Sequence, residues 1–286
     1  MSRLGIIGVG LLGSSVARAA RFYGVADTIA GFDRDSDNLT RAEELGVVDI
    51  ACATLAEAVE GADRVVLAIP VGGVAGVLTA LAPHWNPATR YTDTGSTKQD
   101  VIAVLRAVFG EVPSNFVPGH PIAGAEQSGV AAGRADLFVG KRVILTPCPE
   151  TSAVALADIT AFWQQLGATV ACMDAHRHDR ILAATSHLPH VLAFVLTELL
   201  GRRDEQEAIF QYAAGGFRDF SRIASSDPVM WRDICVANQA HLVPLIDEYC
   251  AALTATRNLI AHASADELHD RFERARLARQ RFLNLT

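Results

Sequence analysis

The sequence predicts an α/β protein with a Rossmann-type, mostly parallel sheet, followed by an all-α C-terminal domain. Three observations support this class. Short β-rich runs alternate with helical ones up to about residue 174, a glycine-rich GVGLLG follows the first such run, and strand signals then vanish. Alternation of this kind is typical of a parallel sheet with helices on both faces.

The elements follow in order along the chain. Buried strands are expected at 3–8, 28–33, 64–70, 89–95, 115–119, 141–147 and 168–174, where apolar and β-branched residues cluster. Helices are expected at 11–24, from about 34 to 45, at 74–83 and at 159–167. Beyond 174, helical periodicity dominates 181–201, 228–263 and 266–283, and these segments are apolar enough to pack together as a bundle. The predicted domains are therefore 1–173 and 174–286.

Composition excludes several functional classes. The 286 residues carry a net charge of -7, which argues against nucleic-acid binding and against a basic membrane-binding surface. Five scattered cysteines without a CxxC pair predict reduced thiols and a cytoplasmic location. The apolar N-terminus lacks a small-residue cleavage site, so no signal peptide is expected. The uncharged run 65–88 is broken by Pro70 and three glycines into a strand, a turn and a helix, so no membrane span is expected.

The first strand is followed by a dinucleotide-binding fingerprint. Gly8, Gly10 and Gly13 allow a tight turn and a close approach of the backbone to a pyrophosphate at the start of a helix. The intervening positions of the fingerprint that open this helix are Leu11 and Leu12. Asp33, about 20 residues on, suits the adenosine ribose and favours NAD over NADP, although Arg34 could receive a 2′-phosphate. The alternative is a tight turn followed by a solvated acid.

The stretch GHPIAGAEQSG (119–129) follows neither the helical nor the strand period. We therefore expect a shaped loop that holds His120 between glycines and Pro121. An imidazole accepts protons near neutral pH, which makes His120 a candidate general base. The alternative is a histidine that only packs the loop.

Five motifs occur in a fixed order: DTGSTK (93–98), GHPIAGAEQSG, SHLPH (186–190), GGFRDFSRIA (215–224) and SDPVMWRDI (226–234). Together they resemble the prephenate and arogenate dehydrogenases of tyrosine biosynthesis, over nearly the whole chain. The resemblance implies NAD-dependent oxidative decarboxylation of prephenate to 4-hydroxyphenylpyruvate. It also implies a homodimer formed through the helical domain.

The resemblance assigns roles to particular residues. His120 resembles the family's catalytic histidine, and Ser96 the serine that hydrogen-bonds it, although Ser96 alone would suit a helix N-cap. Arg222 resembles the arginine that binds a substrate carboxylate, with a surface salt bridge to Asp219 as the alternative. His190 resembles a residue lining the substrate side-chain pocket.

Three further residues are assigned by the same resemblance. Glu126 and Asp219 match acidic positions of an ionic network around the pocket mouth. Trp231 matches a tryptophan that approaches the neighbouring active site of the dimer, with a core position as the alternative. His176, His178, Asp179, His187 and His190 lie close in sequence without the spacing of a zinc site. No metal is expected.

Two other functions remain open. The substrate could be arogenate, or both compounds, although the second histidine of SHLPH favours prephenate or dual use. A non-catalytic NAD-sensing protein would keep the fold and lose the general base or the carboxylate-binding arginine. In this chain both His120 and Arg222 are present.

Overall fold

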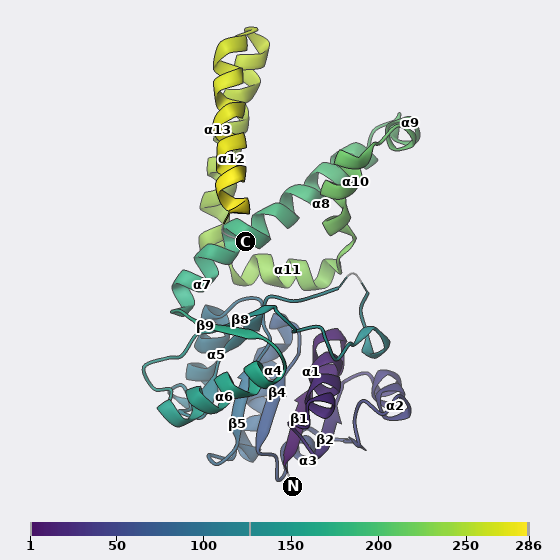
Figure 1. Cartoon of the computed structure of the whole chain (residues 1–286), viewed down its shortest axis with the longest axis vertical. Coiled ribbons are helices and arrows are strands. Elements are labelled where there is room, and N and C mark those ends of the chain that lie inside the picture. The colour runs from purple at the N-terminus through teal and green to yellow at the C-terminus, as the bar shows by residue number, and fades with distance from the viewer. Residues whose placement is uncertain (1, 126, 285–286) are drawn as a thin grey trace. The chain divides into compact units, whose positions relative to one another are not determined.

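The computed structural model describes residues 2–125 and 127–284. Contacts between residues divide the chain into two compact units, Met1–Gln239 and Ala240–Thr286. The first unit holds both sheets and the helices up to α11, and the second holds a pair of long helices (Figure 1).

The strands are β1 (Arg3–Ile7), β2 (Thr28–Phe32), β3 (Ile50–Ala51), β4 (Arg64–Leu67), β5 (Arg90–Asp93), β6 (Phe116–Val117), β7 (Gly119–Pro121), β8 (Arg142–Leu145) and β9 (Thr169–Cys172). Seven of them lie close to the expected positions, whereas β3 and β7 were not expected as strands. The helices among them are α1 (Leu11–Phe22), α2 (Ser36–Glu44), α3 (Leu55–Val59), α4 (Val74–Leu81), α5 (Gln99–Phe109) and α6 (Ala153–Gln165). The later helices are α7 (Ala175–Leu182), α8 (Leu188–Gly201), α9 (Gln206–Gln211), α10 (Gly215–Ser221), α11 (Pro228–Ala237), α12 (Gln239–Ala261) and α13 (Ala265–Leu283).

The main sheet is parallel throughout, in the order β3-β2-β1-β4-β5-β6. This order confirms the predicted Rossmann-type class. Ile7 pairs with Leu67, and Leu67 with Asp93, so the carboxyl ends of β1, β4 and β5 reach the same edge. In such sheets that edge is where ligands bind.

The two faces of the main sheet are covered by different helices. Alternating strand residues such as Leu4 and Ile6 pack with α1, α2 and α6. Strand residues that point to the opposite face, such as Val65 and Leu67, pack with α3, α4 and α5. A strand buried on both faces reads as a continuous apolar run, which is why the sequence predicted β1 and β4 well.

A second sheet of three strands, in the order β7-β8-β9, carries the GHP motif. The prediction that 119–129 is entirely a loop is wrong for its first three residues. His120 pairs antiparallel with Ile144 of β8, and Pro121 with Val143. Pro121 is tolerated because β7 is an edge strand. The N–H that proline lacks is not needed there for a hydrogen bond of the sheet.

The α7 and α8 helices join through a π-helical turn at Ala183–His187. The turn lies directly before Pro189, whose missing N–H leaves a carbonyl one turn back without its usual partner, and a wider turn accommodates this. The predicted helix 228–263 is divided at Asn238 into α11 and α12. Within the described chain, one helical run, Ala175–Gly201, is long and apolar enough to cross a membrane by length and composition.

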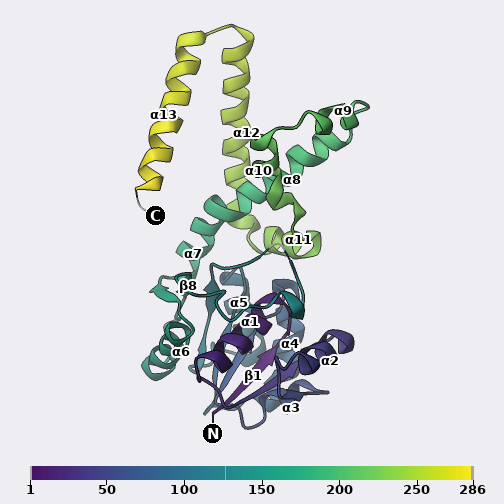
Figure 2. The ribbon, with the colours of Figure 1, turned by 45° about the vertical axis from the view of Figure 1, so that its right-hand side comes forward.

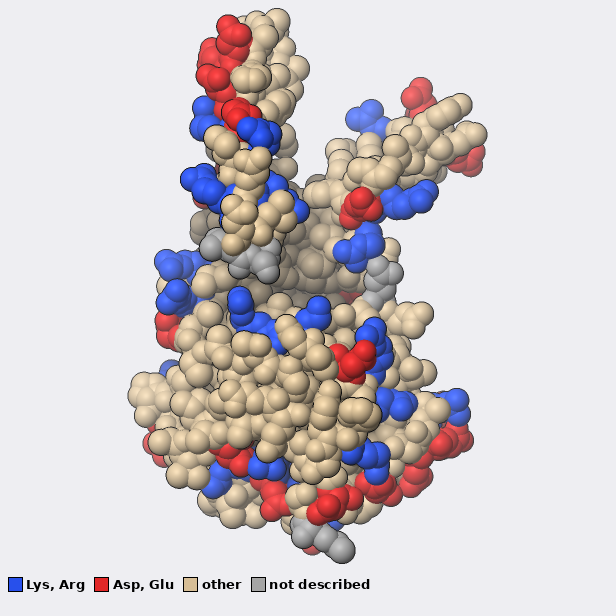
Figure 3. All heavy atoms as spheres, in the orientation of Figure 1, with Lys and Arg blue, Asp and Glu red and all other residues tan. Residues whose placement is uncertain are grey.

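The second unit is a hairpin of α12 and α13, seen clearly in Figure 2. A stripe on α12 with helical spacing, Tyr249, Leu253 and Ile260, is exposed. Asp266 and Glu267 lie in the first turn of α13 and Arg281 in its last, which matches the helix dipole. On the face shown in Figure 3, acidic and basic side chains are interspersed over the first unit, with uncharged surface between them.

Candidate functional site

The glycine turn after β1 has the shape that a dinucleotide requires. Gly8 has a φ of +89°, and a Cβ there would lie 2.5 Å from the carbonyl oxygen of Ala68. A Cβ on Gly13 would collide with the carbonyl oxygen of Gly8, so α1 packs directly on the turn. A Cβ on Gly10 would meet no described atom within 4 Å. Gly10 is the N-cap of α1 without a side-chain cap, which leaves first-turn N–H groups for an anion.

Asp33 follows β2 and faces this turn. Its Oδ2 accepts hydrogen bonds from Val9 N–H at 2.8 Å and Asn38 Nδ2 at 3.1 Å, and its Oδ1 accepts one from Asp35 N–H at 3.0 Å. Among the described residues these three donors leave Oδ1 room for one more. The carboxylate is therefore held in place with capacity for a ribose hydroxyl. Leu11 and Leu12 are half-buried and pack against the core beside the turn.

A buried ion pair forms the floor of the site. Lys98 and Asp93 are 0% and 2% exposed in their side chains and contact each other directly. Lys98 Nζ also donates to the carbonyl oxygen of Gly119 at 2.7 Å, and Gly119 N–H donates to Asp93 Oδ1 at 2.9 Å. The pair therefore occupies both backbone groups at the start of β7. This fixes the strand that carries His120.

His120 is buried at the end of a chain of polar groups. Its Nδ1 lies 2.9 Å from Nε2 of His178, and Nδ1 of His178 lies 2.7 Å from Oδ1 of Asp179. His178 and Asp179 are 0% and 1% exposed, and His120 is 9% exposed. Burial lowers the pKa of His120 well below its ordinary value, and the neighbouring His178, Lys98 and His187 lower it further. His120 is therefore neutral at physiological pH.

Asp179 is held by backbone groups from the start of α5. Its Oδ1 accepts from Lys98 N–H and its Oδ2 from Gln99 N–H, both at 2.9 Å. Burial alone would raise the pKa of Asp179, but the hydrogen bonds from His178, Gln99 and Lys98 prevail, and the pKa is lowered. The carboxylate stays ionised although it is buried.

Asn238, at the break between α11 and α12, ties a second histidine to the same cluster. Its Nδ2 donates to the backbone carbonyl of Asp179 at 2.8 Å and to Nδ1 of His187 at 3.0 Å. Burial lowers the pKa of His187 to about 4, with nearby His178 and His190 adding to the effect and Asp179 opposing it. His187 is therefore neutral, with its proton on Nε2.

His190 lies one turn further along α8. Its Nδ1 donates to the carbonyl oxygen of Ser186 at 2.9 Å, and its ring stacks on Trp231 with centroids 3.6 Å apart. Burial lowers the pKa of His190, the bond to Ser186 opposes this, and the charge of Arg222 adds to it. Trp231 is 8% exposed and packs with Val71 and Ile234 in a small cluster, so α11 contacts the turn after β4.

Three of the remaining predicted residues can be placed. Ser96 is half-buried in the turn between β5 and α5, and Asp219 and Arg222 are exposed at and just after α10. Glu126 lies outside the described residues. No group of three or more His, Cys, Asp or Glu side chains among the described residues is arranged to hold a metal ion.

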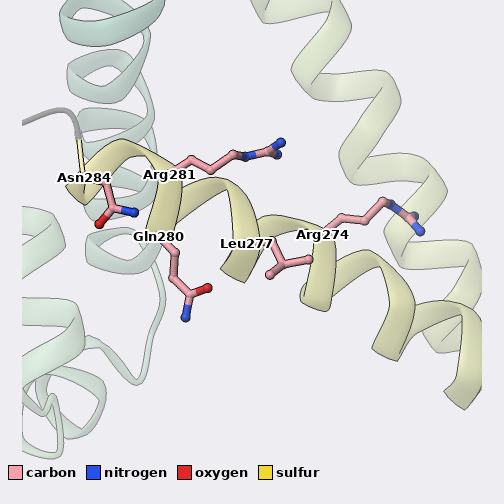
Figure 4. Close-up of a pocket in the computed structure, with 5 residues that line it drawn as sticks. All are labelled: Arg274, Leu277, Gln280, Arg281 and Asn284. Carbon is pink, nitrogen blue, oxygen red and sulfur yellow. The ribbon is translucent and has the colours of Figure 1, made fainter.

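Two hollows are formed by the later helices, outside the group of buried polar residues around His120. One, of about 420 Å³, is lined by residues of α13 alone, Arg274, Leu277, Gln280, Arg281 and Asn284 (Figure 4). Another, of about 250 Å³, lies between α8 and α11 and is mostly apolar, with Trp231, Phe194 and Pro228 in its wall. Neither is lined by His120 or the glycine turn.

Sequence reasoning missed five polar residues, four in the cluster and Asn38 beside the glycine turn. Lys98 lies within the DTGSTK motif, but nothing nearby in sequence predicts its bond to Gly119. His178 and Asp179 were weighed only as metal ligands, and Asn38 and Asn238 carried no signal. The partners that bring them into the site lie between 21 and 81 residues away.

The chain matches two family models. Residues 16–172 match the nucleotide-binding domain of prephenate dehydrogenase, and residues 174–274 match its dimerization domain. The cyclohexadienyl dehydrogenase of Zymomonas mobilis is 38% identical over 279 residues, 96% of this chain and 94% of that protein. The prephenate dehydrogenase of Bacillus subtilis is 33% identical, covering 95% of this chain and 73% of its own length.

Solved structures agree with the sequence comparisons. The prephenate dehydrogenase of Aquifex aeolicus, in complex with hydroxyphenyl propionate and NAD⁺, superposes with a TM-score of 0.91 at 33% identity, covering 99% of this chain and 98% of that one. The arogenate dehydrogenase of Synechocystis gives 0.81 at 26% identity, covering 98% and 99%. With both family models matched and relatives of 38% and 33% identity over nearly its whole length, this chain belongs to the prephenate dehydrogenase family.

Proposed function

We propose that the chain catalyses the NAD⁺-dependent oxidative decarboxylation of prephenate to 4-hydroxyphenylpyruvate in tyrosine biosynthesis. One observation carries the proposal: the strand of the neutral, buried His120 is bonded through Gly119 to Asp93 at the carboxyl end of β5, on the sheet edge where β1 ends in the dinucleotide-binding turn. A hydride acceptor and a proton acceptor are the two groups that oxidation of a secondary alcohol requires.

NAD fits the residues that would hold it. The first-turn N–H groups of α1 suit its pyrophosphate, Gly10 leaves space for it, and Asp33 has an acceptor for a ribose hydroxyl. When bound, NAD⁺ supplies the acceptor for the hydride on the carbon that bears the 4-hydroxyl.

His120 holds the proton of that hydroxyl while the oxygen becomes a carbonyl. The carbon–carbon bond to the ring carboxylate then breaks, CO₂ leaves, and the bonding electrons make the ring aromatic and the oxygen a phenolate. The phenolate takes the proton back from His120. Atoms and charge balance without a net proton, so a base with little exposure to water is sufficient.

The substrate's two carboxylates need cationic or hydrogen-bonding partners. Arg222 pairs with a carboxylate, and its effect on the pKa of His190 indicates that the two lie near each other. His190 contacts the substrate side chain, with Trp231 stacked behind it. Ser96 bonds the hydroxyl region, and Glu126 and Asp219 border the pocket.

The chain acts as a homodimer in the cytoplasm, with 1–173 as the cofactor domain and 174–286 as the substrate and dimerisation domain. Support comes from the name of the second family model, from exposed apolar residues such as Val195, Leu199 and Leu253, and from five free cysteines. An apolar surface of this kind is usually covered by a partner.

A second substrate is favoured by one observation. The 38% identical relative from Zymomonas mobilis is named a cyclohexadienyl dehydrogenase, which suggests use of arogenate as well. The test is NADH formation followed by absorbance with prephenate and then with arogenate. We expect turnover with prephenate and a higher kcat/KM for it than for arogenate. NAD⁺ binding without turnover of either compound would instead indicate a sensing protein.

A further inference from the structure

We propose that His178 and Asp179 are positioning residues that hold His120 in the one tautomer whose Nε2 lone pair is free to act as the base. The inference rests on the proposed function for its kinetic part. Its structural part, the tautomer of His120, stands without substrate or cofactor.

The tautomers follow from the order of the hydrogen bonds. Asp179 is an ionised carboxylate and only accepts, so Nδ1 of His178, 2.7 Å from Oδ1, must carry a proton. A His178 that carries this one proton has its lone pair on Nε2. Nε2 of His178 lies 2.9 Å from Nδ1 of His120, so that nitrogen must donate. The remaining nitrogen of His120, Nε2, is therefore bare.

The order of donors and acceptors is fixed, because Asp179 is itself held in place by several hydrogen bonds. Both oxygens accept backbone N–H groups at the start of α5, and its backbone carbonyl accepts from Asn238. If Nδ1 of His178 lost its proton, a lone pair would face a carboxylate, and a buried pair of acceptors is unfavourable. The inverted chain would also place a proton on Nε2 of His120 and abolish the base.

The hydrogen-bonded series Asp179–His178–His120, here called the relay, positions the base and does not conduct the proton. The proton that His120 takes returns to the same substrate oxygen, so no path to solvent is needed, and Asp179 is 1% exposed. Asp179 instead offers the negative charge that faces the imidazolium through His178. The other charged or titratable groups near this cluster include Lys98 before α5, Asp93 of β5, Asp100 of α5 and His187 of the π-helical turn. Lys98 is paired with Asp93, and Lys98 and His187 both oppose protonation of His120.

The tautomer is measured directly by ¹⁵N NMR of histidine-labelled protein without ligands. The His120 signals are assigned by comparison with the His120→Asn variant. We expect protonated Nδ1 and bare Nε2 in wild type at neutral pH. Protonated Nε2 in wild type would overturn the proposal, whatever the enzyme's substrate proves to be.

Two variants of His178 separate positioning from packing. His178→Leu fills the site without an acceptor, and His178→Gln offers a side-chain carbonyl to Nδ1 of His120. For the Leu variant we expect mixed tautomers of His120 and a kcat about 10²-fold lower, part of the usual contribution of a general base. The KM for prephenate and the affinity for NAD⁺ should change less than about threefold, because general-base catalysis acts on kcat and not on binding. The Gln variant should recover at least about tenfold in kcat, since it restores an acceptor for the base.

His176→Gln is the matched control, because His176 is exposed two residues earlier on α7 and the kcat should not change. A kcat of the Leu variant within about twofold of wild type would overturn the proposal, as would a folded Gln variant with no gain over Leu. If the Leu variant does not fold, the wild-type spectrum and the Gln variant decide alone, and a bare Nδ1 in either contradicts the relay. A wild type that turns over neither prephenate nor arogenate refutes the proposed function and leaves the spectrum as the test of the relay.

Discussion

Two regions depart from the usual pattern of burial in opposite ways. The cluster around His120 buries polar groups, and the later helices expose apolar ones. The cluster hides groups that usually face water: Lys98 and His178 are 0% exposed and Asp179 is 1% exposed. The helices expose groups that usually lie inside: Leu253 is 57% exposed and Ile260 61%. The first arrangement is stable only because the buried groups are hydrogen-bonded to one another, and the second is the kind of surface that a partner usually covers.

The contrast shows which part of the molecule is complete in one chain. In the cluster, each of the polar groups described above finds its partner within residues 93–238. The apolar stripe of α12 does not. The groups proposed for proton transfer therefore lie within one chain, and the exposed stripe fits the proposed dimer.

The largest expected effect comes from removing the base itself. His120→Asn keeps a polar side chain at the end of the relay but cannot hold the substrate proton. We expect kcat to fall about 10²–10⁴-fold, the usual contribution of a general base. Calorimetric NAD⁺ affinity should stay nearly unchanged. Near-full turnover of a purified, folded variant would remove His120 from the catalytic role.

The buried ion pair should matter most for stability. Lys98→Met leaves Asp93 as an uncompensated buried charge, which typically costs about 3–5 kcal/mol of the free energy of unfolding. Urea denaturation of the two proteins measures the difference. Lys141→Met is the control, because Lys141 is exposed and should change stability by no more than about 0.5 kcal/mol. Equal effects of the two substitutions would contradict the structural role of the pair.

The buried histidines should make stability fall in mild acid. Burial holds the pKa of His187 near 4 in the folded chain, against 6.5 when unfolded. Between these values the unfolded state binds more protons, so stability declines as pH falls from about 6.5 towards 4. The decline from His187 is at most about 3 kcal/mol, and it is constant below pH 4.

The variant His187→Asn isolates this contribution, because an amide oxygen can replace Nδ1 as the acceptor for Asn238. Unfolding free energies from pH 4 to 7 should show a shallower decline for the variant, while His120 and His190 supply the rest. Parallel curves for both proteins would show that His187 is not buried as a neutral group.

The exposed stripe should respond to charge through association. Leu253→Glu places a carboxylate on the apolar stripe of α12, and the loss of one buried leucine weakens a dimer by about 1.5–3 kcal/mol. Sedimentation at several concentrations measures the shift to monomer. Ala255→Glu adds the same charge on another face of α12, two residues along. If both variants dissociate equally, or neither does, the stripe is not the interface.

Local patterns were sufficient to predict most of the framework. Apolar runs identified β1, β4 and β8, because strands buried on both faces need them, and the glycine spacing identified the turn before α1. The three residues of β7 were read as a loop, because Gly-His-Pro has little β-propensity and its register depends on β8, more than 20 residues later. The break at Asn238 was also missed, since its side chain bonds Asp179, 59 residues away.

The relay shows the same limit more sharply. His120 could be selected from its rigid glycine-flanked motif, whereas its partner His178 is 58 residues away. His178 and Asp179 were considered only as possible metal ligands, which their spacing did not support. Only the pairing of β7 with β8 and the position of α7 near the start of α5 bring these groups together.

The pH dependence of kcat/KM for prephenate tests most directly whether a buried, neutral His120 is the base. Activity requires the unprotonated imidazole, and burial, His178, Lys98 and His187 all lower its pKa. We therefore expect kcat/KM to be level above pH 6.5 and to fall only well below it, with a limb that is absent in His120→Asn. An acid limb at or above 6.5, or one that persists unchanged in that variant, would contradict the assignment.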